Sequence, residues 1–263
     1  MPRVSRLSIT PVKGLGLLHP DEVDLERFGV VGNRRFYLIA PGGRLFSGVD
    51  HGPLVRIQPR YDAARDFLSL TFPDGSIVED EVAVGELVAT DFWGRTVSGR
   101  VVAGAWAEAL SAYAGKDVRL VKTEEPGDGS DVHAVTLLSE ESVAELARRA
   151  GRDAVDGRRF RMLVDLVGCA PHEEDTWAGR EMRLGEALVR ILGPVPRCAT
   201  TTRDPSSGIR DLDTLRVIKD YRGLRSDRHL DFGVYADVLE PGRVRVGDPV
   251  GSGLEIADRD FKT

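Results

Sequence analysis

The strongest constraint on the fold lies in the first hundred residues, which form short strand patterns separated by glycine and proline. Residues 66–72 alternate apolar and polar side chains and stop at Pro73-Asp74-Gly75. Residues 34–40 form a second strand pattern, which ends at the turn of residues 41–43. Alternation with period two, closed by turn residues, is typical of antiparallel hairpins. Several such units at short spacing predict a barrel or a sandwich rather than a parallel sheet.

The remaining chain mixes helices and strands. Residues 105–115 predict a first helix, and a second, capped by Ser139, keeps its apolar positions on one face up to Gly151. Asp213 caps a third helix over residues 214–222. Further strands are expected at residues 162–167, 187–192 and 243–246. Residues 124–131 contain no apolar side chain and predict a surface loop near a domain boundary.

Composition limits the class of protein. The chain has 263 residues, 41% hydrophobic and 30% charged, which is typical of a globular protein with one large or two small domains. A net charge of −6 argues against a nucleic-acid partner. No apolar run has the length of a membrane span, and the N-terminus lacks the apolar core of a secretory signal. Two cysteines allow at most one disulfide, so we expect a reduced, cytoplasmic protein without a membrane partner.

Cys198 is the leading candidate for a reactive residue of a functional site. Arg197 precedes it and a polar turn of threonines, serines and glycine follows, so the segment supplies the positive charge and the donors that stabilise a thiolate. The alternative is a chance free cysteine on a loop. Cys169, between Gly168 and Ala170, is expected to be a buried small residue, and a disulfide between the two cysteines is not expected.

The absence of several known motifs argues against a metal site, a nicotinamide or nucleotide cofactor and a serine hydrolase. The five histidines have no metal-ligand spacing, and the chain has no Rossmann fingerprint, P-loop or Gly-x-Ser-x-Gly. The segment of residues 173–177 could supply a general acid or base, or be a charged turn ahead of a strand around residues 182–184.

Cations stand beside small or aromatic residues in three segments, at Lys13, at residues 32–36 and at residues 157–161. If they converge on Cys198 they could hold an anionic cofactor; the alternative is that they are solvated surface charges.

The chain resembles the MOSC proteins, named for the C-terminal domain of molybdenum-cofactor sulfurase, and most of all the branch of the mitochondrial amidoxime-reducing component and its bacterial relatives. The resemblance covers nearly the whole chain and rests on motifs at residues 11–14, 35–38, 138–142, 160–161, 174–177, 197–198, 201–208 and 246–250. It implies a β-rich α+β fold. An N-terminal β-barrel-like domain would cover residues 1–118, and a MOSC β-barrel with peripheral helices residues 119–263.

The resemblance also implies the site. Cys198 would be the catalytic residue and the ligand of molybdenum carried by molybdopterin, which suits a soft sulfur donor. The cofactor-binding residues would be Lys13, Arg35, His133, Arg161, Arg197, Thr201 and Thr202. Two motifs depart from the family pattern: Gly14 replaces a serine, and Met162-Leu163 replaces a Pro-Asn pair.

The leading functional hypothesis is a molybdenum enzyme that reduces N-hydroxylated or N-oxide small molecules. Sulfur transfer through a Cys198 persulfide and a non-catalytic cofactor carrier are the alternatives. Because the chain lacks a flavin or nicotinamide signature and has too few cysteines for a cluster, we expect a separate electron donor, a ferredoxin or a flavodoxin with its reductase. Pyridoxal phosphate is not expected.

Overall fold

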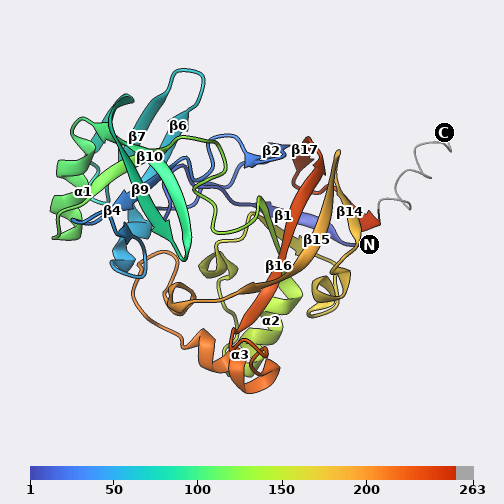
Figure 1. Ribbon diagram of the computed structural model, residues 1–263. Helices are drawn as coiled ribbons and strands as arrows, with labels where there is room; N and C mark the ends of the chain where they lie inside the picture. The colour runs from blue at the N-terminus through green and yellow to red at the C-terminus, as the bar shows by residue number, and fades with distance from the viewer. Residues whose placement is uncertain (253–263) are drawn as a thin grey trace.

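The computed structural model describes residues 1–252 as two β-rich halves that pack together (Figure 1). In Figure 1 the half that contains α1 and the strands from β4 to β10 lies on the left, and strands β14 to β17 lie on the right. Helices α2 and α3 lie below the right-hand strands. The predicted β-rich α+β fold is confirmed.

The C-terminal half is built on a seven-stranded sheet with the order β1-β13-β12-β16-β15-β14-β18. Its strands are β1 (Arg3–Leu7), β12 (Val135–Ser139), β13 (Val164–Val167), β14 (Glu181–Leu184), β15 (Ala187–Pro196), β16 (Asp231–Glu240) and β18 (Val250–Ser252). The two edges meet, because Arg3 bridges to Pro249 and the N–H of Val250 donates to the carbonyl of Pro2 at 2.8 Å. The sheet is therefore a nearly closed barrel, and closure removes the unpaired edges of a sheet.

The N-terminal half has a five-stranded sheet with the order β5-β4-β11-β10-β9 and a three-stranded sheet, β6-β7-β8. Their strands are β4 (Phe36–Ile39), β5 (Leu45–Phe46), β6 (Gln58–Asp62), β7 (Phe67–Thr71), β8 (Ile77–Glu81), β9 (Ala83–Phe92), β10 (Arg95–Ala103) and β11 (Arg119–Thr123). A further three-stranded sheet, β17-β2-β3, pairs a strand near the end of the described chain with two strands near its start. It consists of β2 (Glu22–Glu26), β3 (Gly29–Val30) and β17 (Gly242–Arg245). The strands predicted from the sequence correspond to β4, β7, β13, β15 and β17, and the one expected around residues 182–184 corresponds to β14.

The helices follow the predicted signals. They are α1 (Trp106–Ala114), α2 (Glu140–Arg149) and α3 (Thr214–Arg222), with short 3-10 turns η1 (Gly52–Arg56), η2 (Gly157–Phe160), η3 (Glu173–Trp177) and η4 (Ala199–Thr202). The Ser139 hydroxyl accepts a hydrogen bond from the N–H of Ser142 at 3.1 Å, and the Asp213 carboxylate accepts one from Arg216 at 3.1 Å. Both N-caps satisfy donors that a helix leaves free at its first turn.

The sheets do not divide the chain at one point. Strand β11, which begins at Arg119, pairs with β10 and β4 of the N-terminal half, and β1 pairs with β13 of the barrel. The segment of residues 124–131 follows β11 and has no helix or strand. The division of the chain into residues 1–118 and 119–263 stays a prediction. What the topology establishes is that strands β1 and β2, from the start of the chain, pair with strands β13 and β17 of the C-terminal half.

Candidate functional site

Lys13 is a buried ammonium between the two halves. Its backbone N–H donates to the carbonyl of Phe36 at 2.8 Å, which fixes it at the start of β4. Its Nζ donates to the carbonyl of Gly129 at 3.0 Å and forms an ion pair with Asp131, both in the loop before β12. The residue is only 7% exposed, and this burial lowers its pKa to about 8 despite the Asp131 carboxylate.

Arg34 and Arg161 stand in left-handed backbone, with φ of 51° and 54°. This conformation is uncommon for residues with long side chains and gathers at functional sites. The Arg34 guanidinium lies 3.4 Å from Asp131 and donates to the carbonyl of Arg161 at 3.3 Å. The Arg161 guanidinium donates to the carbonyl of Leu15 at 2.7 Å. Burial, together with the charge of Arg34, lowers the pKa of Arg161 to about 10.

Arg197 lies beneath the segment of Cys198. Its guanidinium donates to the carbonyls of Phe232, at 2.7 Å, and Phe160, at 3.2 Å, and contacts the sulfur of Met162 at 2.8 Å. Burial lowers the pKa of this side chain to about 10. Arg197 is thus held in place by neutral acceptors and forms no ion pair within residues 1–252, although the more distant carboxylates of Asp131 and Asp231 act on its charge.

We call Lys13, Arg34, Arg161 and Arg197 the basic cluster. Among the residues that the structure describes, Asp131 is the one carboxylate in an ion pair with any of the four. Burial would raise the pKa of Asp131, but the positive charges of Lys13 and Arg34 outweigh it and hold that pKa below its ordinary value. The cluster therefore keeps an excess of about three positive charges in a partly dehydrated region, where charges interact more strongly than in water.

Cys198 is exposed and stands at the N-cap position of η4. Its thiol lies 3.4 Å from the hydroxyl of Thr200. The turn behind it is rigid, because the Thr201 hydroxyl bonds to the carbonyl of Cys198 at 3.0 Å and to the hydroxyl of Thr214 at 2.8 Å. Buried Arg159 ties the same turn to the carboxylate of Asp211, at 3.0 and 3.2 Å. The thiol is thus presented to solvent on a fixed support.

Contacts between loops connect Cys198 with Lys13. A Cβ added at Gly48 would lie 3.9 Å from the methyl group of Thr200, and one added at Gly14 would lie 3.4 Å from the amide nitrogen of Gly48. Gly14 has φ of +92°, a conformation that a serine at this position would adopt only with strain. Glycine therefore suits the backbone of this loop at position 14.

Other predicted site residues are engaged elsewhere. The guanidinium of Arg35 donates to the hydroxyl of Thr123 at 2.8 Å and joins no contact of the basic cluster. The Thr202 hydroxyl bonds to the carbonyl of Ala199 at 2.7 Å, inside its own turn. His133 pairs with the carboxylate of Asp237 at 3.0 Å. The assignment of these side chains to a cofactor stays a prediction.

Leu163 is a core residue in this chain. It is 4% exposed and packs in the barrel, while its backbone N–H bonds to the hydroxyl of Thr136 at 2.9 Å. Its neighbour Met162 offers its sulfur to Arg197. The two residues that replace the family's Pro-Asn pair therefore fill the barrel and support Arg197.

Sequence reasoning missed Asp131 and Tyr235, and it included Arg34 only within the cationic segment of residues 32–36. Burial raises the pKa of the Tyr235 hydroxyl, and the charges of Asp131 and Arg197 act on it, so this side chain borders the basic cluster. Its ring centroid lies 5.1 Å from that of His133, which brings that predicted residue to the edge of the site. The signal for Arg34 was the Arg-Arg pair itself, but only the left-handed backbone decides which arginine turns inward.

A second buried ionisable group lies at the start of α2. Glu174 of η3 is 0% exposed and accepts hydrogen bonds from the Ser142 hydroxyl at 2.7 Å and the Ser139 hydroxyl at 3.0 Å. The N–H of Ser139 adds a third donor at 3.3 Å. We call these three residues the acidic centre. The sequence left the segment of residues 173–177 open between general acid and charged turn, and in the structure it precedes β14 and supports α2.

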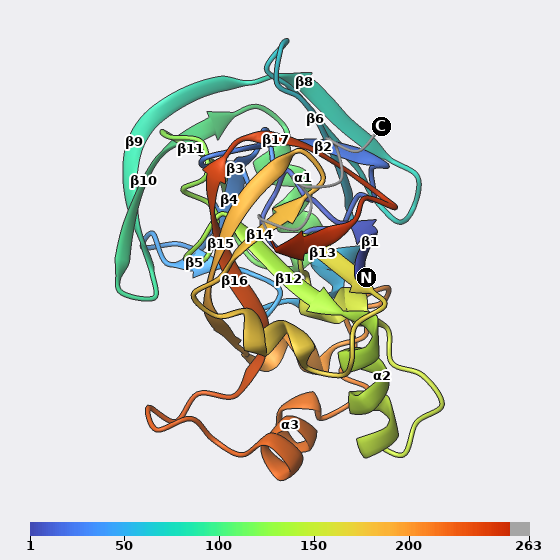
Figure 2. The same ribbon diagram turned by 90° about the vertical axis from the view of Figure 1, so that its right-hand side faces the viewer.

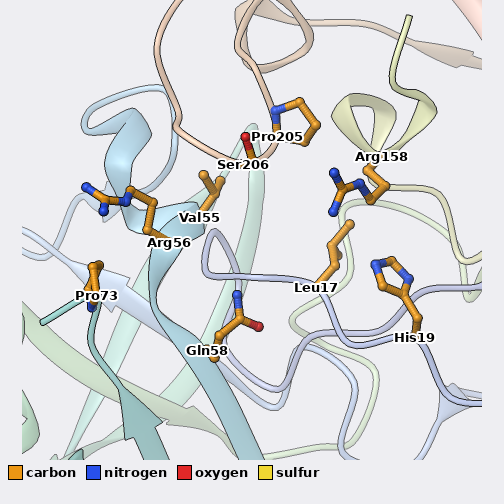
Figure 3. A pocket seen from close by; sticks show the side chains of 9 residues that line it. All are labelled: Leu17, His19, Val55, Arg56, Gln58, Pro73, Arg158, Pro205 and Ser206. Atoms are coloured by element: carbon orange, nitrogen blue, oxygen red, sulfur yellow. The ribbon is translucent and has the colours of Figure 1, made fainter. Parts of the chain in front are cut away.

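A cavity of about 340 Å³ opens between the two halves (Figure 3). In Figure 3 Arg158 and His19 lie on one side of it and Arg56 on the other. Its lining residues are Leu17, His19, Val55, Arg56, Gln58, Pro73, Arg158, Pro205 and Ser206. It includes neither Cys198 nor a member of the basic cluster, and the Arg158 guanidinium is already paired with Asp156 at 2.5 Å. We therefore locate the candidate site at the basic cluster and Cys198.

Family models match both halves of the chain. A MOSC N-terminal beta barrel domain matches residues 1–117, and a MOSC domain matches residues 124–251. The chain therefore belongs to the MOSC family, as the resemblance predicted. No helix within residues 1–252 is long and apolar enough to cross a membrane.

The curated relatives share part of their length with this chain. Mitochondrial amidoxime reducing component 2 of Bos taurus is 35% identical over 128 residues, and mitochondrial amidoxime-reducing component 1 of Homo sapiens is 34% identical over 128 residues. Each match spans 46% of this chain and 37% of the relative. Molybdenum cofactor sulfurase of Oryza sativa subsp. japonica is 30% identical over 117 residues, which are 40% of this chain and 14% of that protein.

Among solved structures, the YUAD protein from Bacillus subtilis aligns with 95% of this chain and 94% of its own, at 14% identity and a TM-score of 0.43.

Proposed function

We propose that this chain binds the molybdenum cofactor and reduces N-hydroxylated or N-oxide small molecules. The observation that carries the proposal is the excess of positive charge in the basic cluster beside the exposed thiol of Cys198. The relatives' names, amidoxime-reducing component and molybdenum cofactor sulfurase, support the same class of cofactor and substrate.

The donor set fits this cofactor. Arg161 and Arg197 are partly buried guanidinium groups that donate to backbone carbonyls and form no ion pair within residues 1–252. Arginine binds phosphate through two parallel hydrogen bonds. Lys13 and Arg34 add two further cations, shared with a single carboxylate. A cysteine thiolate is a ligand that soft metal centres prefer. An anionic, thiol-ligated group therefore complements both the charge and the chemistry of the site.

The residues of this chain would hold and orient the reactants. The cofactor, when bound, would supply the two-electron redox chemistry. Cys198 would be the metal ligand, and the basic cluster would bind the phosphate and orient the pterin. Lys13, whose pKa is lowered to about 8, still carries a proton at Nζ at neutral pH. Burial keeps the Tyr235 hydroxyl protonated, so it can donate a hydrogen bond to a polar substrate.

Metal analysis tests the proposal. Protein purified from a host that makes the cofactor should contain about one molybdenum per chain, and Cys198→Ser should lose it while Cys169→Ser should retain it. Substrate-dependent turnover then distinguishes the reductase from the carrier. Absence of molybdenum, with sulfide released by a reductant, would instead favour sulfur transfer through a Cys198 persulfide.

The same proposal includes a separate electron donor, a ferredoxin or a flavodoxin with its reductase. The isolated chain should show no turnover with NADH or NADPH and should turn over with dithionite-reduced viologen. Electron-transfer contacts of this kind are usually small and transient. Efficient reduction driven by NADPH in the isolated chain would contradict this part of the proposal.

A further inference from the structure

The turn of the β9–β10 hairpin has an unusual residue at a constrained position. Phe92 pairs with Arg95, so Trp93 and Gly94 form a two-residue loop. Their φ angles are 53° and 92°, both in the left-handed region. Loops of this geometry favour Asn-Gly or Asp-Gly, because asparagine and aspartate tolerate the first position with little strain. Tryptophan at this position carries a conformational cost without forming a better turn.

Burial of the Trp93 indole does not offset this conformational cost. It is 65% exposed, whereas Trp106 and Trp177 are 1% and 4% exposed. Its neighbour Phe92 fills the core beneath, at 1% exposure, with 5.8 Å between the two ring centroids. A large exposed aromatic side chain in strained backbone is a feature of binding sites rather than of ordinary turns.

The turn lies over Lys13, one member of the basic cluster. The Nζ of Lys13 is 5.2 Å from the centroid of the Trp93 ring and 5.3 Å from that of Phe92. Arg95, on the same turn, donates to the carbonyls of Asp128 and Ser130 at 2.8 and 2.7 Å. Figure 2 shows this hairpin along the left-hand side of the molecule, with its turn at the lower end. Trp93 is therefore fixed above Lys13 by contacts on both sides of the turn.

We propose that Trp93 is the specificity-determining residue of the substrate site and stacks against planar, conjugated N-hydroxylated compounds. The proposal rests on the function proposed above and adds the preferred substrate class. One part of the indole faces the Lys13 ammonium, and the exposed part offers a flat apolar surface beside the cations. Aromatic rings prefer offset or edge contacts with such a surface. An aromatic amidoxime would gain this contact, and an aliphatic one would not.

Benzamidoxime and acetamidoxime form a matched pair for the first test, because they differ only in a phenyl or a methyl group. Trp93→Asn should raise the KM for benzamidoxime about tenfold, as expected for the loss of one aromatic contact. The KM for acetamidoxime and both kcat values should stay nearly unchanged. Trp93→Phe should restore most of the preference. Equal losses for both substrates, or a loss of molybdenum from Trp93→Asn, would overturn the assignment.

A measurement of thermal stability distinguishes a binding role of Trp93 from a structural one. Because asparagine suits the first turn position, Trp93→Asn should have a Tm equal to or above that of the wild type. A clear fall in Tm, with the substrate preference unchanged, would mean that Trp93 serves the hairpin and not the ligand.

A binding measurement on metal-free protein does not depend on turnover. Trp93 is the one exposed tryptophan of the three, all of which lie within the described residues. Benzamidoxime should quench tryptophan emission saturably, acetamidoxime should not, and Trp93→Phe should abolish the change. If molybdenum and activity are absent but this quenching is found, the proposed function fails and the aromatic site stands. Absence of quenching in both metal-free and metal-loaded protein would refute the aromatic site alone.

Discussion

The basic cluster and the acidic centre both contain buried ionisable groups, but these groups differ in how far the protein itself satisfies them. At the acidic centre one carboxylate, Glu174, receives three hydrogen bonds from Ser139 and Ser142, so its acceptors are satisfied inside the protein. In the basic cluster two of the four cations, Lys13 and Arg34, pair with one carboxylate, Asp131, and the other two form no ion pair within residues 1–252. A buried group with complete hydrogen bonding stabilises the fold, whereas uncompensated charge next to solvent is available for a ligand.

The two cysteines differ in the same way, because Cys169 is buried near Glu174 of the acidic centre and Cys198 is exposed beside Arg197 of the basic cluster. Cys169 is 7% exposed, and burial together with the charge of Glu174 raises its pKa to about 12. Cys198 is exposed and directly follows Arg197 of the basic cluster. A thiol becomes a nucleophile or a metal ligand as the thiolate, so the two environments predict opposite reactivities.

Thiol alkylation should give the largest difference. At pH 7 a thiol with a pKa of 12 is ionised in about one molecule in 10⁵, and Cys169 is buried as well. Iodoacetamide should therefore modify Cys198 at least about a thousandfold faster than Cys169. Peptide mass spectrometry would locate the adduct, and Cys198→Ser should remain unlabelled until it is denatured. A fast second adduct, on Cys169 of the native protein, would contradict the predicted difference between the two cysteine environments.

Removal of one uncompensated cation should weaken anion binding strongly. Arg161→Ala would leave an anionic ligand without a charge-assisted hydrogen bond, a loss of about 2–5 kcal/mol in a desolvated site. Molybdopterin occupancy and the affinity for inorganic pyrophosphate, measured by calorimetry, should both fall.

Arg216→Ala is the matched control, because its side chain is 79% exposed on α3. Equal losses in the two variants would mean that overall charge, rather than the basic cluster, binds the anion. Arg203 is unsuitable as a surface control, since its guanidinium donates to the carbonyls of Gly208 and Val49 at 3.0 and 3.1 Å.

Disruption of the acidic centre should affect stability and leave anion binding intact. Glu174→Ala would deprive buried donors of Ser139 and Ser142 of their acceptor, at a cost of about 2–3 kcal/mol in the free energy of unfolding. Urea denaturation measures this loss, and pyrophosphate affinity should not change. Glu181→Ala, at an exposed pair with Arg190, should cost less than about 1 kcal/mol. A similar loss in pyrophosphate affinity for Glu174→Ala would show that the two centres are coupled.

Local signals in the sequence predicted much of this fold. The caps Ser139 and Asp213 marked two helices correctly, and turn residues marked strands such as β4 and β7. The long hairpin β9–β10 was missed, because most side chains of β9 are exposed and carry no clear alternation. The site was predicted less completely. Cys198 and its polar turn were evident, but the choice between Arg34 and Arg35 depends on one left-handed residue, which sequence pattern does not encode.

The smallest expected effect is a pH dependence that belongs to the basic cluster alone. Burial lowers the pKa of Lys13 to about 8, so the ammonium is present at pH 7 and largely lost at pH 9. Because an anionic ligand binds the protonated form, the affinity for sulfate, whose charge is constant over this range, should fall about tenfold between these two pH values. Binding near pH 8 should take up a proton, since the bound anion raises the pKa of Lys13.

Lys13→Arg is the variant that sharpens this last comparison. A guanidinium keeps its charge up to high pH, so the variant should bind sulfate with nearly equal affinity at pH 7 and pH 9. Glu174→Gln, which changes the acidic centre only, should keep the pH dependence of the wild type. Calorimetry in buffers of different ionisation enthalpy would measure the proton uptake directly. A flat profile in the wild type would mean that Lys13 stays paired with Asp131 when the anion binds and contributes no free charge to the site.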